Sequence, residues 1–106
     1  IGAGELAEMK AEAIMINTAR GPVIDEGAIY DALTSGKLAA AGLDVYDQEP
    51  PDAYNPLLAL DNVILTAHMA GPTQESNQAR VRNAFDNVQR VNRGEAPLWV
   101  IPELAQ

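Results

Sequence analysis

The pattern of apolar and polar positions predicts three short strands. Apolar runs begin at Ile14, Leu38 and Val63, and each gives way to polar residues, glycine or proline. Runs of this length, stopped by turn residues, indicate strands, which we place at residues 14–17, 38–46 and 63–66. The first run is apolar at successive positions, which is typical of a strand that is buried on both faces in a parallel sheet covered by helices.

A short helix and a connector are predicted between these strands. Asp25 is a typical N-cap, Glu26 suits the positive end of a helix, and Gly36 stands where a glycine ends one. Ile29 and Leu33 keep helical spacing between them. After the second strand, residues 48–56 form a loop with three prolines, and residues 57–60 form a short turn before the third strand.

A longer helix is predicted near the end of the chain, with Thr73 as its N-cap and Gly94 at its end. We expect charged residues such as Arg80 and Arg82 on a solvated face. The stripe that we expect to be buried recurs every three or four residues and consists of Val81, Ala84, Phe85, Val88 and Val91. An apolar tail follows, and we expect its Trp99 to pack against another domain or chain.

This element order predicts an α/β fold. Strand, helix, strand, connector, strand and helix form half of a Rossmann-like doubly wound sheet, with about three parallel strands and flanking helices. The 106 residues suffice for one small domain rather than two. A sheet of three strands leaves open edges that invite pairing, and the tail around Trp99 needs cover. We therefore expect a homodimer.

The opening segment contains a misleading motif. Residues 2–7 match the loose pattern G-x-G-x-x-[GA] of dinucleotide-binding loops. That pattern is informative only where it follows a strand and opens a helix, and here only Ile1 precedes it. We interpret the segment as a short helix with Leu6 and Met9 directed inward.

The composition of the chain argues against several classes of binding partner. The formal net charge of −8 argues against nucleic acid and against an anionic membrane surface, because both require a basic face. Without cysteine there is no disulfide framework and no thiolate metal site, and we predict no metal site of any kind. No apolar run is long enough to cross a bilayer. These features are typical of a cytoplasmic protein.

Polar residues follow the predicted strands and suggest chemistry. Arg20, Glu49 and His68 each lie beyond the carboxyl end of a strand, and Asp44 lies at the end of the second. Parallel strands bring these ends to one edge, where ligands bind in such sheets. His68 is the only histidine, and a neighbouring carboxylate would favour its imidazolium form and select the ring nitrogen that faces a substrate. Such a histidine can act as a general acid toward a carbonyl oxygen, while Arg20 holds an adjacent carboxylate.

Each of these residues also has a structural interpretation. His68 could be a hydrogen-bonded structural residue, Glu49 an exposed loop acid, Asp44 a turn cap and Arg20 a surface arginine. Their joint occurrence at three strand ends favours the functional interpretation.

Three segments carry a resemblance to a known family. They are residues 9–26, which include Asn17–Gly21, residues 42–50, which include Gly42–Tyr46, and residues 62–71, which include Asn62–His68. In this order they resemble the D-isomer-specific 2-hydroxyacid dehydrogenases. The family usually has proline before the histidine, whereas this chain has Ala67.

The resemblance implies roles for individual residues. Arg20 would bind the substrate carboxylate, His68 would be the acid/base, and Glu49 would be its carboxylate partner. The implied cofactor is NAD or NADP, and the implied substrate is a small 2-oxo or 2-hydroxy acid. The residues implied near the nicotinamide and its ribose are Thr18, Ala19, Arg20, Asp44, His68 and Gly71.

The resemblance covers only the C-terminal third of such enzymes. Residues 1–106 correspond to the second half of the dinucleotide-binding domain with its terminal helix and tail. The glycine-rich loop is absent, so we expect weak or no NAD binding and no turnover by this chain alone. One alternative is a non-catalytic module for dimerisation or partner binding, as in co-repressor relatives of the family. A self-standing flavodoxin-like domain is a third reading, weakened by the absence of a phosphate loop.

Overall fold

The computed structural model describes residues 1–101. The chain forms two compact units, Ile1–Gly71 and Pro72–Gln106, and only the second includes residues beyond those described. All three strands belong to the first unit, and the long helix belongs to the second.

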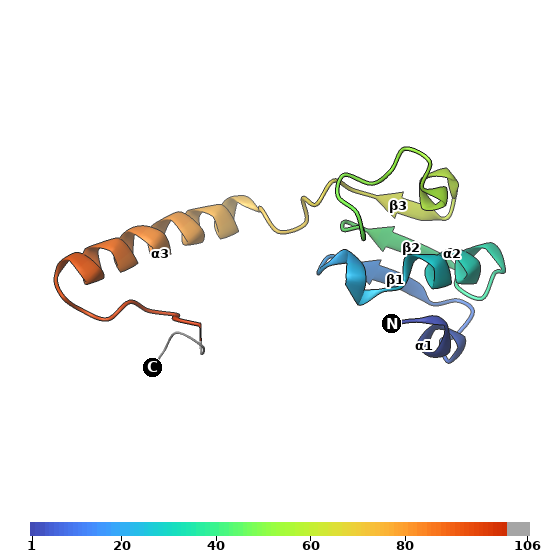
Figure 1. Ribbon diagram of the computed structural model, residues 1–106, viewed down its shortest axis with the longest axis horizontal. Helices are drawn as coiled ribbons and strands as arrows, with labels where there is room; N and C mark the ends of the chain where they lie inside the picture. Colours follow the sequence, from blue (N-terminus) through green and yellow to red (C-terminus); the bar gives the residue numbers. More distant parts are fainter. Residues whose placement is uncertain (102–106) are drawn as a thin grey trace. The chain divides into compact units, whose positions relative to one another are not determined.

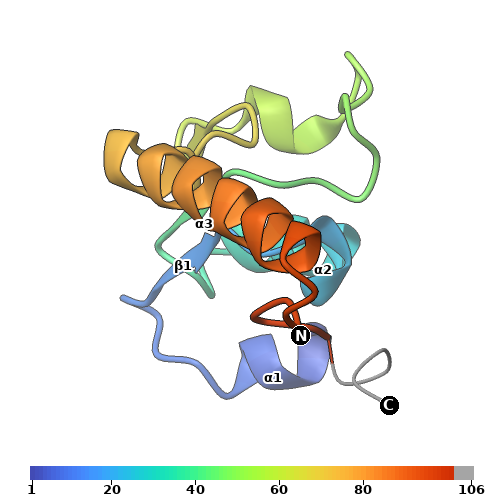
Figure 2. The ribbon, with the colours of Figure 1, turned by 90° about the vertical axis from the view of Figure 1, so that its left-hand side faces the viewer.

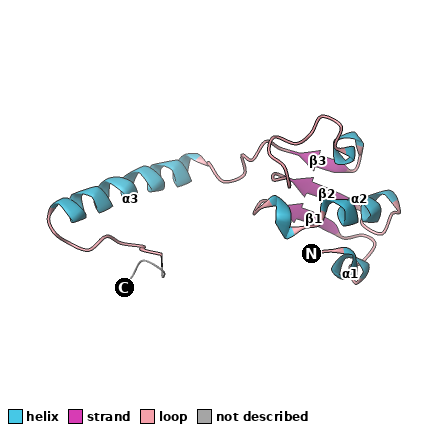
Figure 3. Cartoon of the chain, viewed as in Figure 1, coloured by secondary structure: helices cyan, strands magenta, loops and turns pink. Residues whose placement is uncertain are grey.

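The first unit is built on a parallel sheet with the order β1-β2-β3 (Figures 1 and 3). The strands are β1 (Ile14–Asn17), β2 (Ala40–Leu43) and β3 (Val63–Leu65). Ile16 pairs with Gly42, which in turn pairs with Ile64. The predicted α/β class with three parallel strands is confirmed. The second strand is shorter than the predicted residues 38–46, and the third ends one residue before Thr66.

Short helices connect these strands. They are α1 (Ala3–Ala7), η1 (Gly21–Val23), α2 (Glu26–Thr34) and η2 (Pro56–Ala59). Asp25 caps α2 as predicted, because its side chain accepts a hydrogen bond of 2.8 Å from the amide of Ala28. Gly36 lies just beyond α2 with φ of +74°, a conformation that glycine adopts without strain. The glycine pattern at residues 2–7 falls on the short helix α1, as expected.

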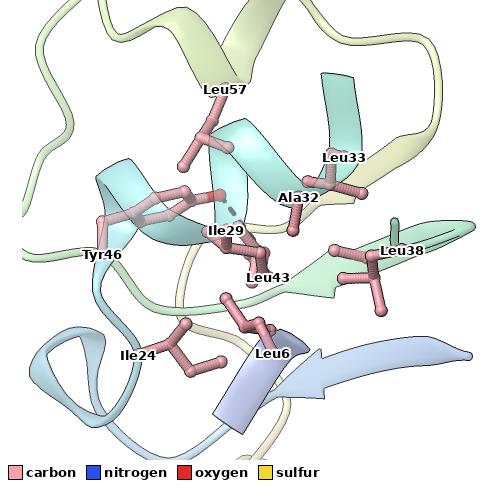
Figure 4. Packing of buried hydrophobic residues seen from close by; sticks show 10 residues of the cluster. Leu6, Ile24, Ile29, Ala32, Leu33, Leu38, Leu43, Tyr46 and Leu57 are labelled. Atoms are coloured by element: carbon pink, nitrogen blue, oxygen red, sulfur yellow. Dashed lines mark hydrogen bonds between the residues drawn. The ribbon is translucent and has the colours of Figure 1, made fainter. Parts of the chain in front are cut away.

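The core of the first unit lies on one face of the sheet (Figure 4). Ile29 and Leu33 of α2, Leu6 of α1 and Leu57 of η2 pack there against side chains of β2 and the residues that flank it. Ile29, Leu38 and Leu57 are the largest fully buried side chains. Removing such side chains from water is the main stabilising contribution to a domain of this size.

The opposite face of the sheet is open in the described chain. Ile14, Ile16 and Ile64 are exposed to 66%, 70% and 75%. The expectation that the first strand is buried on both faces is therefore wrong for the described residues. The apolar pattern is correct, but α1 and α2 both contribute to the one core that covers the other face.

The second unit contains α3 (Gln74–Asn92), an unbroken helix in Figure 2. Thr73 caps it by accepting a hydrogen bond from the amide of Ser76, and Gly94 follows it with φ of +76°. The tail returns along the helix, since Asn87 exchanges two hydrogen bonds with the backbone of Leu98. No helix of the described residues is long and apolar enough to cross a membrane.

The apolar stripe of α3 is exposed, which corrects the expectation of a buried stripe. Val81 and Val91 are each 58% exposed, and Phe85 and Val88 are each 66% exposed. Trp99 is 68% exposed, so the described chain leaves most of its surface uncovered. Periodicity identified the helix and its apolar face correctly, but it carries no information about what the face meets.

Candidate active site at the carboxyl edge of the sheet

A histidine and a carboxylate meet beyond the ends of β2 and β3. Nδ1 of His68 lies 2.8 Å from Oε2 of Glu49. The two side chains are 45% and 38% exposed, so solvent partly screens their charges. His68 has φ of +54°, a left-handed conformation that costs a non-glycine residue on the order of 1–3 kcal/mol. Such strained residues concentrate at functional sites.

The pKa of the Glu49 carboxyl is lowered. The hydrogen bond from His68 is the largest cause, the amide of Tyr46 is the next, and the positive charge of Arg20 adds a smaller decrease. Glu49 is therefore an acceptor at neutral pH, and it selects the neutral tautomer that carries its proton on Nδ1. Nε2 is then the ring nitrogen left for a substrate.

The loop that carries Glu49 is tied to the sheet and to α2. Oε1 of Glu49 accepts a hydrogen bond of 3.1 Å from the amide of Tyr46, just after β2. Glu26, the first residue of α2, accepts bonds of 2.7 Å from the amide of Asp47 and 2.8 Å from the side chain of Asn55. Both ends of the loop are thereby anchored, which limits the positions that Glu49 can take.

Tyr46 links the ends of β2 and β3. Its hydroxyl donates to the carbonyl oxygens of Thr66 at 3.0 Å and Leu43 at 3.3 Å. The residue is only 7% exposed, and burial is the main reason that the pKa of its phenol is raised. The phenol therefore stays protonated and remains a donor.

Asp44 binds the segment that carries His68. Oδ1 accepts from the Thr66 hydroxyl at 2.5 Å and from the Met69 amide at 2.8 Å, while Oδ2 accepts from the Ala70 amide at 2.9 Å. The backbone oxygen of Asp44 accepts from the His68 amide at 2.9 Å. Asp44 is only 3% exposed, yet its pKa is lowered, chiefly by the hydrogen bond from Thr66. Hydrogen bonds to the charged form outweigh its burial.

Arg20 is presented by a tight turn after β1. The buried side chain of Asn17 accepts from the Ala19 amide at 3.1 Å and donates to the Arg20 carbonyl at 2.9 Å. Asparagine commonly forms such turns with its own following backbone. Gly21 comes next, and any side chain there would overlap the backbone carbonyl of Tyr46. The turn after β1 therefore rests directly on the end of β2.

The structure joins some of the predicted residues and not others. His68 and Glu49 are in contact, and Asp44 binds the same segment as His68. Within residues 1–101, Arg20 forms no ion pair, and its guanidinium donates to the carbonyl of Ala19. Arg20 follows the carboxyl end of β1, and its positive charge makes a small contribution to the lowered pKa of Glu49.

Two of the residues implied near a cofactor, Thr18 and Ala19, lie exposed in the turn after β1. Gly71 ends the first unit. Polar, uncharged and small groups beyond strand ends suit a nicotinamide and its ribose. A pyrophosphate would need a glycine-rich turn between a strand and a helix, and none of the turns between a strand and a helix within residues 1–101 is glycine-rich. The described residues also hold no group of three or more His, Asp or Glu side chains placed to bind a metal ion.

Sequence reasoning missed three supporting residues, Asn17, Tyr46 and Thr66. An asparagine at the end of an apolar run, before small polar residues, is a turn signal that could have identified the first. The hydroxyls of Tyr46 and Thr66 bond to groups from the neighbouring strand end, which no local pattern indicates.

Comparisons with known proteins identify the family to which the chain is similar. The sequence model of the D-isomer specific 2-hydroxyacid dehydrogenase NAD binding domain matches residues 1–70. A D-3-phosphoglycerate dehydrogenase from Archaeoglobus fulgidus is 53% identical over 76 residues, which are 72% of this chain and 14% of that protein. A glyoxylate reductase from Korarchaeum cryptofilum is 43% identical over 97 residues, which are 92% of this chain and 29% of that protein.

Solved structures give the same result. The structure of D-lactate dehydrogenase with NAD⁺ from Lactobacillus jensenii has a TM-score of 0.85 at 34% identity, with 95% of this chain and 34% of that chain covered. A D-isomer specific 2-hydroxyacid dehydrogenase from Xanthobacter autotrophicus, in complex with NADPH and MES, has a TM-score of 0.81 at 40% identity, with 95% of this chain and 41% of that chain covered. This chain thus spans less than half the length of each of these proteins, and it belongs to the D-isomer-specific 2-hydroxyacid dehydrogenase family, as part of the NAD-binding domain.

Proposed function

We propose that this chain supplies the acid/base residues of an NAD- or NADP-dependent oxidoreductase that interconverts a small 2-oxo acid and a D-2-hydroxy acid. The observation that carries the proposal is the 2.8 Å contact between His68 and Glu49 beyond the ends of β2 and β3. In this proposal residues 1–106 are the C-terminal half of a dinucleotide-binding domain with its terminal helix and tail.

His68 is the proposed general acid. In the reducing direction, its protonated imidazole gives the Nε2 proton to the carbonyl oxygen while the carbonyl carbon receives a hydride. The O–H and C–H bonds of the hydroxy acid form in this step, and the imidazole is left neutral. Glu49 orients the ring by accepting from Nδ1, which leaves Nε2 to face the carbonyl oxygen. In the oxidising direction Nε2 takes the proton back.

Arg20 is the proposed substrate anchor. A guanidinium offers two parallel donors to a carboxylate, and that geometry would set the adjacent carbonyl in one orientation. The charge would also draw electrons from the carbonyl as negative charge develops on its oxygen. Arg20 is exposed and its side chain bonds only to a neighbouring carbonyl within the described residues, so it can turn to a ligand at low cost.

The proposed cofactor supplies the hydride when it is bound. Thr18, Ala19, Arg20, His68 and Gly71 would border the nicotinamide and its ribose. Asp44 would do so through Oδ2, which accepts a single hydrogen bond from the described residues and so has capacity for another. Because the described residues offer no turn for a pyrophosphate, we expect this chain alone to bind NADH weakly. A calorimetric titration with a micromolar dissociation constant would contradict that expectation.

A chimera tests the proposed activity. In the chimera, this chain replaces the matching segment of the glyoxylate reductase from Korarchaeum cryptofilum. The two proteins align over 92% of this chain. We expect the chimera to reduce glyoxylate with NADH or NADPH, and the His68→Gln chimera to lose on the order of 10²- to 10⁴-fold in kcat, as is usual for a general acid. A chimera that folds and binds the cofactor but gives no turnover would contradict the proposal.

Two further proposals concern assembly. The alternative function is a non-catalytic dimerisation or partner-binding module. The exposed side chains of Ile16 and Ile64 favour this alternative, because an exposed apolar surface is typical of a site that binds another protein. We also propose a homodimer, because β1 and β3 leave open sheet edges and Trp99 is exposed. Sedimentation velocity should show a dimer at tens of micromolar chain, and a monomer at every concentration would contradict this proposal.

A further inference from the structure

Most of the hydrogen bonds that hold the segment carrying His68 go to one residue, Asp44, which directly follows β2. Thr66, His68, Met69 and Ala70 all donate to Asp44, through the Thr66 hydroxyl and the three backbone amides. These bonds reach three different oxygen atoms of Asp44, its two carboxylate oxygens and its backbone carbonyl. Through these bonds residues 66–70 stay attached to the end of β2, although β3 itself ends at Leu65.

The segment has little else to hold it in place. Thr66, Ala67, His68 and Met69 are all exposed, so burial of apolar surface contributes little. It belongs to no helix or strand, and Ala67 leaves its backbone freer than a proline would. His68 nevertheless adopts a positive φ, a conformation that persists only where the surrounding contacts impose it. From Met69 and Ala70 to His68 itself, the hydrogen bonds go to Asp44 and Glu49, while Tyr46 and Leu43 bond to Thr66 at the start of the segment.

We propose that Thr66 and Asp44 form a clamp that positions the His68 backbone so that Nδ1 meets Glu49. Thr66 is a positioning residue in this proposal, because it acts on His68 rather than on the reacting atoms, and Asp44 positions His68 in addition to the cofactor contact proposed for its Oδ2. The proposal deepens the proposed function and rests on it for its catalytic meaning. The clamp itself is a property of the chain that can be measured without substrate or cofactor.

The threonine hydroxyl has a defined part in the clamp. Oδ1 of Asp44 receives the Thr66 hydroxyl and the Met69 amide, and the shorter of the two bonds is the one from Thr66. This bond keeps the carboxylate in the orientation that reaches both Met69 and Ala70. Valine has nearly the shape of threonine but no hydroxyl, so Thr66→Val removes the bond, whereas Thr66→Ser keeps a donor.

Amide hydrogen exchange tests the clamp. In the unsubstituted chain, we expect the amides of Met69 and Ala70 to be protected although they belong to no regular element. In Thr66→Val they should exchange about 10-fold faster or more, since a hydrogen bond to a charged group is lost and local opening becomes easier. The amide of Ala41, which bonds to Asn62 between β2 and β3, should keep its rate.

A second readout follows the imidazole itself. His68 is the only histidine of the chain, so its ring nitrogen resonances are unambiguous. The Nδ1 resonance should shift away from its hydrogen-bonded position in Thr66→Val and return in Thr66→Ser. The matched control is Thr34→Val, which removes a threonine hydroxyl from the exposed end of α2 and should leave the imidazole unchanged.

Several results would overturn the clamp. One is exchange of Met69 and Ala70 in the unsubstituted chain at the rate of an unstructured peptide, and this measurement needs no variant. Equal acceleration of the Met69, Ala70 and Ala41 amides in Thr66→Val would show a general loss of stability instead, and an unchanged Nδ1 resonance would show that the clamp does not act on His68. None of these results bears on turnover by the chimera, so failure of the clamp and failure of the proposed function are distinguishable.

Discussion

Nδ1 of His68 and Oε2 of Glu49 lie 2.8 Å apart although 19 positions separate them in the chain. Each residue is held there by a different set of hydrogen bonds. Glu49 sits in a loop whose carboxylate also accepts from the amide of Tyr46, and His68 sits in a segment bound to Asp44. The parallel sheet brings these two segments to one edge, and the hydrogen bonds within each segment determine the final approach.

Acid should weaken the fold through this pair. The pKa of Glu49 lies below its ordinary 4.5, mainly because of the bond from His68, so the unfolded chain binds this proton more readily than the folded chain. The resulting stability is present above the unfolded pKa and is lost as the pH falls through the folded one. We expect Glu49→Gln to lower the urea midpoint at neutral pH, and the difference from the unsubstituted chain to shrink as the pH falls from 4.5 and to vanish below the folded pKa.

The control for that series is Glu12→Gln, which removes the same charge from an exposed residue. Its midpoint should stay close to that of the unsubstituted chain across the same pH range, because surface substitutions away from such contacts change stability by less than about 0.5 kcal/mol. A Glu49→Gln difference that grows as the pH falls would contradict the assignment.

The contact between Gly21 and the end of β2 predicts a sharp contrast between two glycines. A Cβ at Gly21 would overlap the carbonyl of Tyr46, so Gly21→Ala must displace backbone and should destabilise by roughly 1–3 kcal/mol or more. Gly4 lies in α1 with no atom within 4 Å of such a Cβ, so Gly4→Ala should be neutral or stabilising by up to about 1 kcal/mol. Urea unfolding of the two variants measures both, and equal effects would contradict the packing.

Arg20 should matter to substrate binding and a helical arginine should not. In the chimera, Arg20→Gln removes a charge-assisted pair to the substrate carboxylate and should lower kcat/KM by on the order of 10- to 100-fold. Arg80→Gln, on the exposed surface of α3, should leave kcat/KM unchanged. Steady-state kinetics with glyoxylate tests this, and equal losses in the two variants would exclude Arg20 as the anchor.

Much of the fold could be predicted from the sequence because the relevant signals are local. The cap at Asp25, the glycine at Gly36 and the three apolar runs each depend on residues that are close in the chain, and all three strands occur, although the second and third are shorter than predicted. The burial of Ile16 and Phe85 could not be predicted in the same way. Periodicity shows that a face is apolar, but cover comes from elements elsewhere, and both residues are exposed in the described chain.

The candidate site likewise has features that the sequence predicts and features that it does not. The position of His68 beyond a strand end follows from the sheet, so its approach to the end of β2 could be expected. The hydrogen bonds that hold His68 in place could not be predicted, because they join groups from separate strand ends, such as the Thr66 hydroxyl and the Asp44 carboxylate. The turn at Asn17 lies between these two cases, because an asparagine at the end of an apolar run is a local signal for it.

The most direct test of the account is the pKa of Glu49, followed through its carboxyl carbon resonance during an acid titration of this chain. We expect a midpoint below 4.5 in the unsubstituted chain, a clear increase in His68→Gln and a smaller increase in Arg20→Gln, in the order of the contributions that lower it. A midpoint at or above 4.5, or one that His68→Gln leaves unchanged, would show that the imidazole and the carboxylate do not meet at this edge of the sheet.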